Sequence, residues 1–270
     1  MRALAVLSFV SVGLPSANAE ELRIDGGLIQ GGLVIGHTAP RARVYFDGVE
    51  IRVSNDGLFV IGFGKDASAT AHLKVAFADG NVTNEILKIE KRSYRIQRID
   101  GLPKRKVTPK ASDLERIRRE SALVKATRGR DDPRTDFLEG FDWPARGRIS
   151  GVYGSQRILN GEPRRPHYGV DVAGPVGAQV TAPAGGIVTL VHPDMFFSGG
   201  TLILDHGHGL SSSFLHLSAI LVEEGQRVRR GDVIARIGAT GRVTGAHLDW
   251  RMNWFETRID PELLVGEMPK

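Results

Sequence analysis

Residues 240–250 read TGRVTGAHLDW and place His247 and Asp249 two positions apart, after a glycine-rich approach. Side chains at positions i and i+2 of a β-strand point to the same face of the sheet. An imidazole and a carboxylate therefore lie together on one side of a predicted strand. They form either part of a metal site or an ordinary polar strand edge, and the choice depends on the rest of the chain.

A second pair lies upstream, in RRPHYGVDVAGP (164–175), where His167 and Asp171 are four positions apart. Imidazole nitrogen and carboxylate oxygen both ligate zinc, at about 2.0–2.2 Å. A single H-x-x-x-D is a weak indication of a metal site, but a second pair on a downstream strand strengthens it. Between the two pairs, FLHLS places His216 among apolar residues that would hold its ring in one orientation.

Other histidines offer a rival set of ligands. His206 and His208, in DHGHG, also stand two positions apart. Glycine on both sides of His208 indicates a turn between strands, so these two residues are predicted to be structural or surface histidines. The same is predicted for His192, which precedes a proline in a loop.

The stretch from about Trp143 to Trp254 resembles the zinc metallopeptidases of the LytM/lysostaphin type, the M23 family of peptidoglycan endopeptidases. The matching segments occur in the family's order and are GRISGVYGSQRILNGEPRRPHYGVDVAGPVGAQVTAPAGGIV, GGTLILDHGHGLSSSFLHLS and GQRVRRGDVIARIGATGRVTGAHLDW. The resemblance implies a compact antiparallel β-sheet domain with a groove whose floor carries one zinc ion.

The resemblance also implies site residues. The family's H-x-x-x-D metal ligands fall on His167 and Asp171, and its two catalytic histidines fall on His216 and His247. The family's third ligand is the second histidine of an H-x-H motif, and here that position is Asp249.

This departure changes the expected chemistry. Two carboxylates would formally neutralise Zn²⁺, which weakens the acidification of a bound water and favours harder ions such as Mn²⁺. A working variant site, a weakened site and a non-catalytic scaffold are the three readings. Retention of the other four site positions favours the working variant.

The N-terminus predicts export. Residues 1–19, MRALAVLSFVSVGLPSANA, have a basic start, an apolar run and an A-x-A ending, which is the layout of a signal peptide cleaved before Glu20. No later apolar stretch is long enough to span a bilayer. The chain of 270 residues has no cysteine and a formal net charge of +5. Export to the periplasm or cell envelope makes nucleic acid a poor partner, and the mild positive charge is only a weak indication of anionic polymers.

The predicted fold is mainly β. Residues 20–98 alternate apolar and polar residues between Asp-Gly turns and predict a small β-sandwich-like accessory module. Residues 99–135 predict a basic linker and a helix over about 112–127, opened by a capping box of Ser112 and Glu115. The helix has a rough apolar stripe that consists of Leu114, Ile117, Ala122, Leu123 and Val124. Residues 136–266 form the predicted M23-like peptidase domain.

The expected function is that of an exported zinc metalloendopeptidase that hydrolyses peptide cross-links or stems of peptidoglycan. His247 is the expected general base and His216 the expected oxyanion donor, although the sequence permits the reverse. The alternative is a catalytically weakened LytM-type scaffold that binds peptidoglycan or activates a cell-wall amidase. A third reading is an exported β-rich binding protein whose N-terminal module contacts an envelope protein partner.

Overall fold

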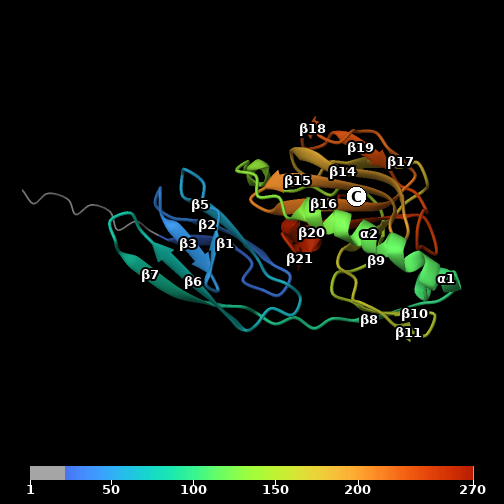
Figure 1. Cartoon of the computed structure of the whole chain (residues 1–270), viewed down its shortest axis with the longest axis horizontal. Coiled ribbons are helices and arrows are strands. Elements are labelled where there is room, and N and C mark those ends of the chain that lie inside the picture. Colours follow the sequence, from blue (N-terminus) through green and yellow to red (C-terminus); the bar gives the residue numbers. More distant parts are fainter. Residues whose placement is uncertain (1–21, 270) are drawn as a thin grey trace, which may run out of the picture.

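Two β-rich parts joined by a helical segment make up the computed structural model, which describes residues 22–269 (Figure 1). The expected signal peptide, residues 1–19, lies outside the described residues. The prediction of a mainly β fold is confirmed. Across the described part of the chain, neither helix combines the length and apolar character that a bilayer crossing requires.

The N-terminal part contains two small antiparallel sheets. One has the strand order β1-β2-β5, and the other the order β4-β3-β6-β7. Asp47 and Gly48 form the two-residue turn between β3 and β4, and both have positive φ, as a type I′ hairpin requires. The strands are β1 (Arg23–Gly26), β2 (Leu33–His37), β3 (Arg43–Phe46), β4 (Val49–Ile51), β5 (Leu58–Gly62), β6 (Thr70–Ala76) and β7 (Val82–Lys88).

The C-terminal part is built on one large antiparallel sheet of order β18-β14-β15-β16-β20-β12-β9, with β21 paired to β20. Its strands are β9 (Ile149–Gly151), β12 (Val170–Ala173), β14 (Gly186–Met195), β15 (Gly199–Gly207), β16 (Leu210–Leu217), β18 (Arg227–Val228), β20 (His247–Trp254) and β21 (Thr257–Ile259). Smaller sheets and two 3-10 turns complete this part: β8 (Ile96–Ile99) with β10 (Gln156–Leu159) and β11 (Glu162–Pro163), β13 (Gln179–Thr181) with β19 (Val233–Arg236) and β17 (Ala219–Ile220), η1 (Asp136–Glu139) and η2 (Pro261–Leu264).

The large sheet has one apolar face and one polar face. On β20, Leu248, Trp250 and Met252 are fully buried and belong to the main hydrophobic core. The residues between them, Asp249 and Arg251, therefore point to the opposite face. Since directly opposed residues of antiparallel strands share a face, the side chains that oppose them on β12 and β16 lie there too.

The helical segment differs in part from its prediction. It contains α1 (Lys104–Val107) and α2 (Ala111–Arg128), and α2 agrees with the expected helix over 112–127. The predicted capping box of Ser112 and Glu115 is wrong, because the helix starts one residue earlier. Asp113 instead accepts the Lys110 N–H at 3.1 Å and the Arg105 guanidinium.

α2 docks on the large sheet by a small apolar contact. Val124 packs against a small cluster that includes Ile203 on β15, whereas the predicted apolar positions Leu114 and Leu123 are exposed. Ile203 opposes Ser213 of β16, which in turn opposes Arg251. The helix therefore lies over the polar face of the sheet, on its β14–β15 side.

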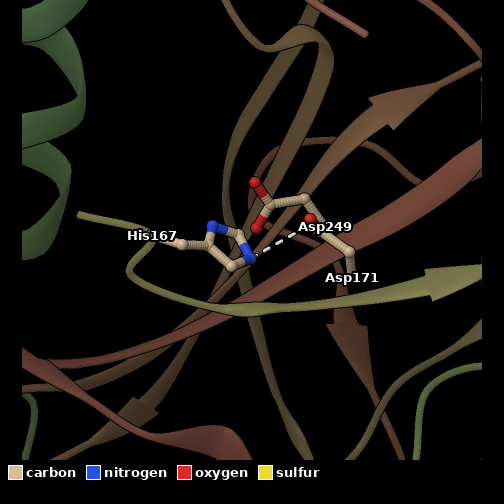
Figure 2. A group of neighbouring side chains, drawn as sticks. All are labelled: His167, Asp171 and Asp249. Carbon is tan, nitrogen blue, oxygen red and sulfur yellow. Dashed lines mark ion pairs between the residues drawn. The ribbon is translucent and has the colours of Figure 1, made fainter. Parts of the chain in front are cut away.

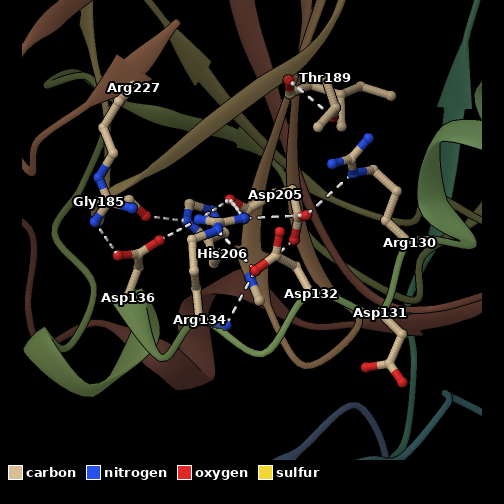
Figure 3. A network of polar contacts seen from close by, with 12 residues as sticks. Arg130, Asp131, Asp132, Arg134, Asp136, Gly185, Thr189, Asp205, His206 and Arg227 are labelled. Carbon is tan, nitrogen blue, oxygen red and sulfur yellow. Dashed lines mark hydrogen bonds and ion pairs between the residues drawn. The ribbon is translucent and has the colours of Figure 1, made fainter. Parts of the chain in front are cut away.

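The segment that follows α2 is fastened to the large sheet by ion pairs (Figure 3). Arg134 contacts Asp132 at 3.0 Å and Asp205 at 3.1 Å, and it also pairs with Asp136. Arg227 contacts Asp136 from the other side at 2.5 Å. This network fixes the chain where it enters the C-terminal part.

Aromatic packing joins the two parts of the molecule. Phe46 meets Phe63 and Trp254 edge-on, at centroid separations of 5.9 and 6.0 Å. Close by, Arg92 contacts the fully buried Asp260 at 2.8 Å. The module is therefore packed onto the end of β20, the strand that carries Asp249.

Gly62→Ala is expected to lower the free energy of unfolding by about 1–3 kcal/mol. A Cβ at this position would lie 2.8 Å from Trp254 Cβ and 3.1 Å from Ile259 Cδ1. Urea denaturation measures the loss. Gly64→Ala is the matched control, since its nearest contact would be 3.8 Å from Thr257 Cγ2. Equal stability of the two variants would show that Trp254 and Ile259 can move to accommodate a methyl group at position 62 without measurable cost.

Candidate metal centre

Three side chains converge on the polar face of the large sheet: His167, Asp171 and Asp249 (Figure 2). Each offers one ligand atom, and these atoms all lie within 4.8 Å of one another. His167 Nε2 is 3.0 Å from Asp171 Oδ1. All three residues are buried, which is typical of side chains committed to an internal polar site.

Strand register places the two carboxylates beside each other. β12 runs antiparallel to β20, and Asp171 opposes Asp249 directly. Glycine makes room for them on both sides. A Cβ at Gly151 would lie 2.2 Å from Asp171 Oδ2, and one at Gly169 would lie 2.8 Å from Asp249 Oδ1.

Several polar atoms at this point have no hydrogen-bond partner. Both ring nitrogens of His167 and Asp171 Oδ1 are buried without a hydrogen bond, because the 3.0 Å approach of Nε2 to Oδ1 does not have hydrogen-bond geometry. Buried polar atoms are nearly always bonded, so a group of orphaned atoms indicates an absent ligand. One imidazole and two carboxylates form a donor set suited to a divalent ion such as zinc or manganese. The residues present therefore fit a metal.

His216 and His247 stand beside this group, with ring centroids 4.9 Å apart. His216 Nδ1 donates to Thr240 O at 2.8 Å, and His247 Nδ1 donates to Gly245 O at 2.9 Å. Each ring therefore presents an unprotonated Nε2 when neutral. These Nε2 atoms lie 4.0 Å from Asp249 Oδ2 and 3.8 Å from Asp171 Oδ1, respectively.

His216 is held in an unusual state. Its φ is +67°, a left-handed conformation that non-glycine residues rarely adopt and that often occurs at functional sites. Burial, partly offset by the negative charge of Asp249, lowers the pKa of its imidazole to about 4. His216 is therefore neutral at physiological pH.

Two arginines that the sequence analysis missed bind the carboxylates. Arg251 donates to Asp249 through Nε at 2.9 Å and Nη2 at 2.5 Å, and Arg157 Nη2 donates to Asp171 Oδ2 at 2.6 Å. Burial alone would raise the pKa of the Asp249 carboxyl, but Arg251 and the nearby histidines hold it well below its usual range. Arg251 could have been found from the sequence, because it stands two positions after Asp249 on the same strand face.

The rival histidines lie elsewhere. His206 is fully buried, donating from Nδ1 to Gly185 O at 2.6 Å and accepting from Ser212 Oγ at 2.8 Å. His208 is buried against the Phe137 ring. His192 accepts the Asp194 N–H at 3.1 Å. None of the three belongs to the group formed by His167, Asp171 and Asp249.

Comparison with known proteins places the chain. Residues 165–261 match the model of peptidase family M23. Peptidoglycan DD-endopeptidase ShyB of Vibrio cholerae serotype O1 is 44% identical over 89 residues, which are 32% of this chain and 20% of that protein. DD-carboxypeptidase/endopeptidase Mpg of Neisseria meningitidis serogroup B is 38% identical over 96 residues, which are 36% of this chain and 21% of that protein. The match thus spans about a fifth of the length of these relatives.

A solved structure extends the likeness to both parts of the molecule. It is a crystal structure from Pseudomonas aeruginosa described as a peptidase M23, with 31% identity and a TM-score of 0.68. The alignment covers 87% of this chain and 94% of that one. The chain therefore belongs to peptidase family M23.

Proposed function

We propose that this chain is an exported, zinc-dependent endopeptidase that hydrolyses peptide cross-links or stems of peptidoglycan. The observation that carries the proposal is the convergence of three ligand side chains with orphaned donor atoms, next to two histidines whose Nε2 atoms face them. The names of the relatives, which include a peptidoglycan DD-endopeptidase, support the choice of substrate.

His167, Asp171 and Asp249 would hold the ion. Zinc is the proposed metal, and Mn²⁺ is the alternative because two of the ligands are carboxylates. A divalent ion in such a site supplies Lewis acidity toward a carbonyl and lowers the pKa of a bound water.

His247 is the proposed general base. Its side chain is 18% exposed, against 7% for His216, so the positive charge that it gains on taking a proton from water is better solvated. The Gly245 carbonyl holds the ring with Nε2 free to accept that proton. The resulting imidazolium can then donate the proton to the departing amine.

His216 receives a different role from the one expected. Its Nδ1–H is used by the Thr240 carbonyl, and burial keeps the ring neutral, so Nε2 accepts hydrogen bonds and does not donate them. We therefore propose that His216 orients the attacking water by accepting its second hydrogen, in place of the oxyanion contact expected from the resemblance.

We propose the following division of the chain from its sequence patterns. Residues 1–19 would direct export to the periplasm or envelope, 20–98 would form the accessory module, 99–135 the linker and 136–266 the peptidase domain. At the boundary between residues 98 and 99, β8 pairs in parallel with β10 of the C-terminal part. An envelope protein partner of the module stays a prediction.

One observation favours the weakened-scaffold alternative. Arg251 already binds both oxygens of Asp249 and so competes with a metal for that carboxylate. In that case the chain would bind peptidoglycan or activate an amidase without cutting peptides. Release of soluble peptides from purified sacculi by the mature protein, loaded with zinc or manganese, decides between the two functions.

His216→Ala and His247→Ala should each lower peptide release at least about 100-fold, since each removes a group that handles a proton. Bound metal should stay near the wild-type level, because neither residue is a proposed ligand. His167→Ala should lose both activity and metal. The exposed His72 provides the control variant His72→Ala. If the wild type releases nothing with either metal over a broad pH range, the scaffold function stands.

Asp249→Ala should weaken metal binding by at least about tenfold, because it removes one of three proposed ligands and leaves Arg251 without its carboxylate partner. Competition with a chelator measures the affinity. Asp249→His supplies the ligand type found elsewhere in the family and should bind zinc over manganese more selectively. Unchanged affinity in Asp249→Ala would show that the site does not use three protein ligands.

Arg251→Met should move the rising limb of the pH–rate profile upward by about one pH unit, or about 1.4 kcal/mol. Loss of the guanidinium leaves the negative charge of Asp249 uncompensated beside the site. That charge disfavours the loss of a further proton there, because the loss would add a second negative charge. Arg251→Lys keeps the charge and should keep the limb in place. An unshifted limb in Arg251→Met, with metal content intact, would mean that Arg251 acts only in folding.

A further inference from the structure

A cluster of three arginines lies on the polar face of the large sheet, next to Asp249. Arg251 binds Asp249, as described above. Arg258 Nη1 donates to Asn253 Oδ1 at 3.2 Å, and Arg128, the last residue of α2, donates to Ser213 Oγ at 3.2 Å. Ser213 opposes Arg251, and Asn253 opposes Arg258. Arg128, Arg251 and Arg258 form what is called here the arginine cluster.

The cluster has more positive charge than its surroundings neutralise. Within residues 22–269, neither Arg128 nor Arg258 forms an ion pair, and Glu256 is the acidic group whose negative charge acts on both from a longer distance. Arg128 is only 7% exposed, and its Nε has no hydrogen-bond partner. Burial and repulsion from Arg251 lower the pKa of Arg258 to about 10. Buried cations without a counter-charge are unfavourable unless an anion is bound nearby.

A cavity of about 520 Å³ opens onto Arg258. One wall is the loop 64–67 of the N-terminal module, and the rest comes from Arg165, Tyr168 and residues 256–258. Lys65 is neutralised by Asp66 at 2.5 Å. The remaining charged groups of the lining are Arg165, Arg258 and Glu256, so the cavity itself is net positive.

The cavity lies beside the metal centre. Tyr168 follows the ligand His167 directly in the chain, and its ring is 5.8 Å from the Arg258 guanidinium. Arg258 opposes Asn253, four residues beyond the ligand Asp249 on β20, so a peptide that extends along this strand from the metal for about 13 Å would reach the cavity. The N-terminal module contributes the wall formed by residues 64–67, so the packing of the module against Trp254 helps to form this cavity.

We propose that this cavity binds a carboxylate of the substrate peptide, with Arg258 as its main contact and Arg165 as a second. The proposal rests on the peptidase function proposed above. A guanidinium fork matches the two oxygens of a carboxylate and carries two parallel hydrogen bonds to it. The module would thus shape one wall of the cavity, whereas both proposed carboxylate contacts come from the C-terminal part.

Binding can be tested without turnover. N-acetyl-D-Ala-D-Ala and its C-terminal amide are titrated calorimetrically into the full mature chain, stripped of metal with a chelator so that no ion can bind the carboxylate. The acid should bind at least about tenfold more tightly than the amide. Arg258→Gln should remove this preference, Arg258→Lys should keep part of it, and Arg146→Gln, at an exposed arginine, should leave it unchanged. Equal binding of acid and amide by the wild type would overturn the proposal.

Two further measurements keep the outcomes separate. Arg258→Gln relieves repulsion within the cluster, so its melting temperature should equal or exceed that of the wild type, and the acid should raise the melting temperature of the wild type only. Inorganic phosphate, titrated in the same way, should bind more weakly than the peptide acid. Tighter binding of phosphate would overturn the assignment to a peptide carboxylate. A preserved preference for the acid in a chain that hydrolyses no sacculi would overturn the proposed function and leave this site standing.

Discussion

The register between β12 and β20 is the constraint on which the site depends. It sets Asp171 directly opposite Asp249, so two buried carboxylates lie side by side. Such a pair repels itself unless positive charge is supplied. The structure meets this requirement with Arg157 and Arg251, and the remaining space between the carboxylates and His167 suits a divalent cation.

The period of two on β20 could be read from the sequence, and it separates the two faces of the sheet correctly. The strand-rich fold and the helix between its two parts were predictable for the same reason, because alternation and Asp-Gly turns are local signals. The start of α2 was not predictable, because Asp113 accepts both the Lys110 N–H and the guanidinium of Arg105, which comes from the preceding helix. The apolar stripe expected on that helix is confirmed only at Val124, which packs on a small apolar cluster, whereas Arg128 docks by a hydrogen bond to Ser213.

The missed arginines differ in how far they could have been foreseen. Arg251 belongs to the same strand face as Asp249, so spacing alone indicates the contact. Arg157 reaches Asp171 from β10, and no local pattern connects that strand to β12. Arg128 and Arg258 lie near one another only because α2 packs over the sheet to which β21 belongs. Contacts of this kind depend on tertiary packing.

The carboxylate at position 249 and the guanidinium at position 251 are best understood together. A histidine ligand is neutral and needs no counter-charge, whereas an aspartate in a fully buried position does. Arg251 supplies that charge from two residues away, so the local field is closer to that of a neutral ligand than the sequence motif alone implies. The aspartate of H-x-D is therefore compensated electrostatically by a partner two residues along the same strand.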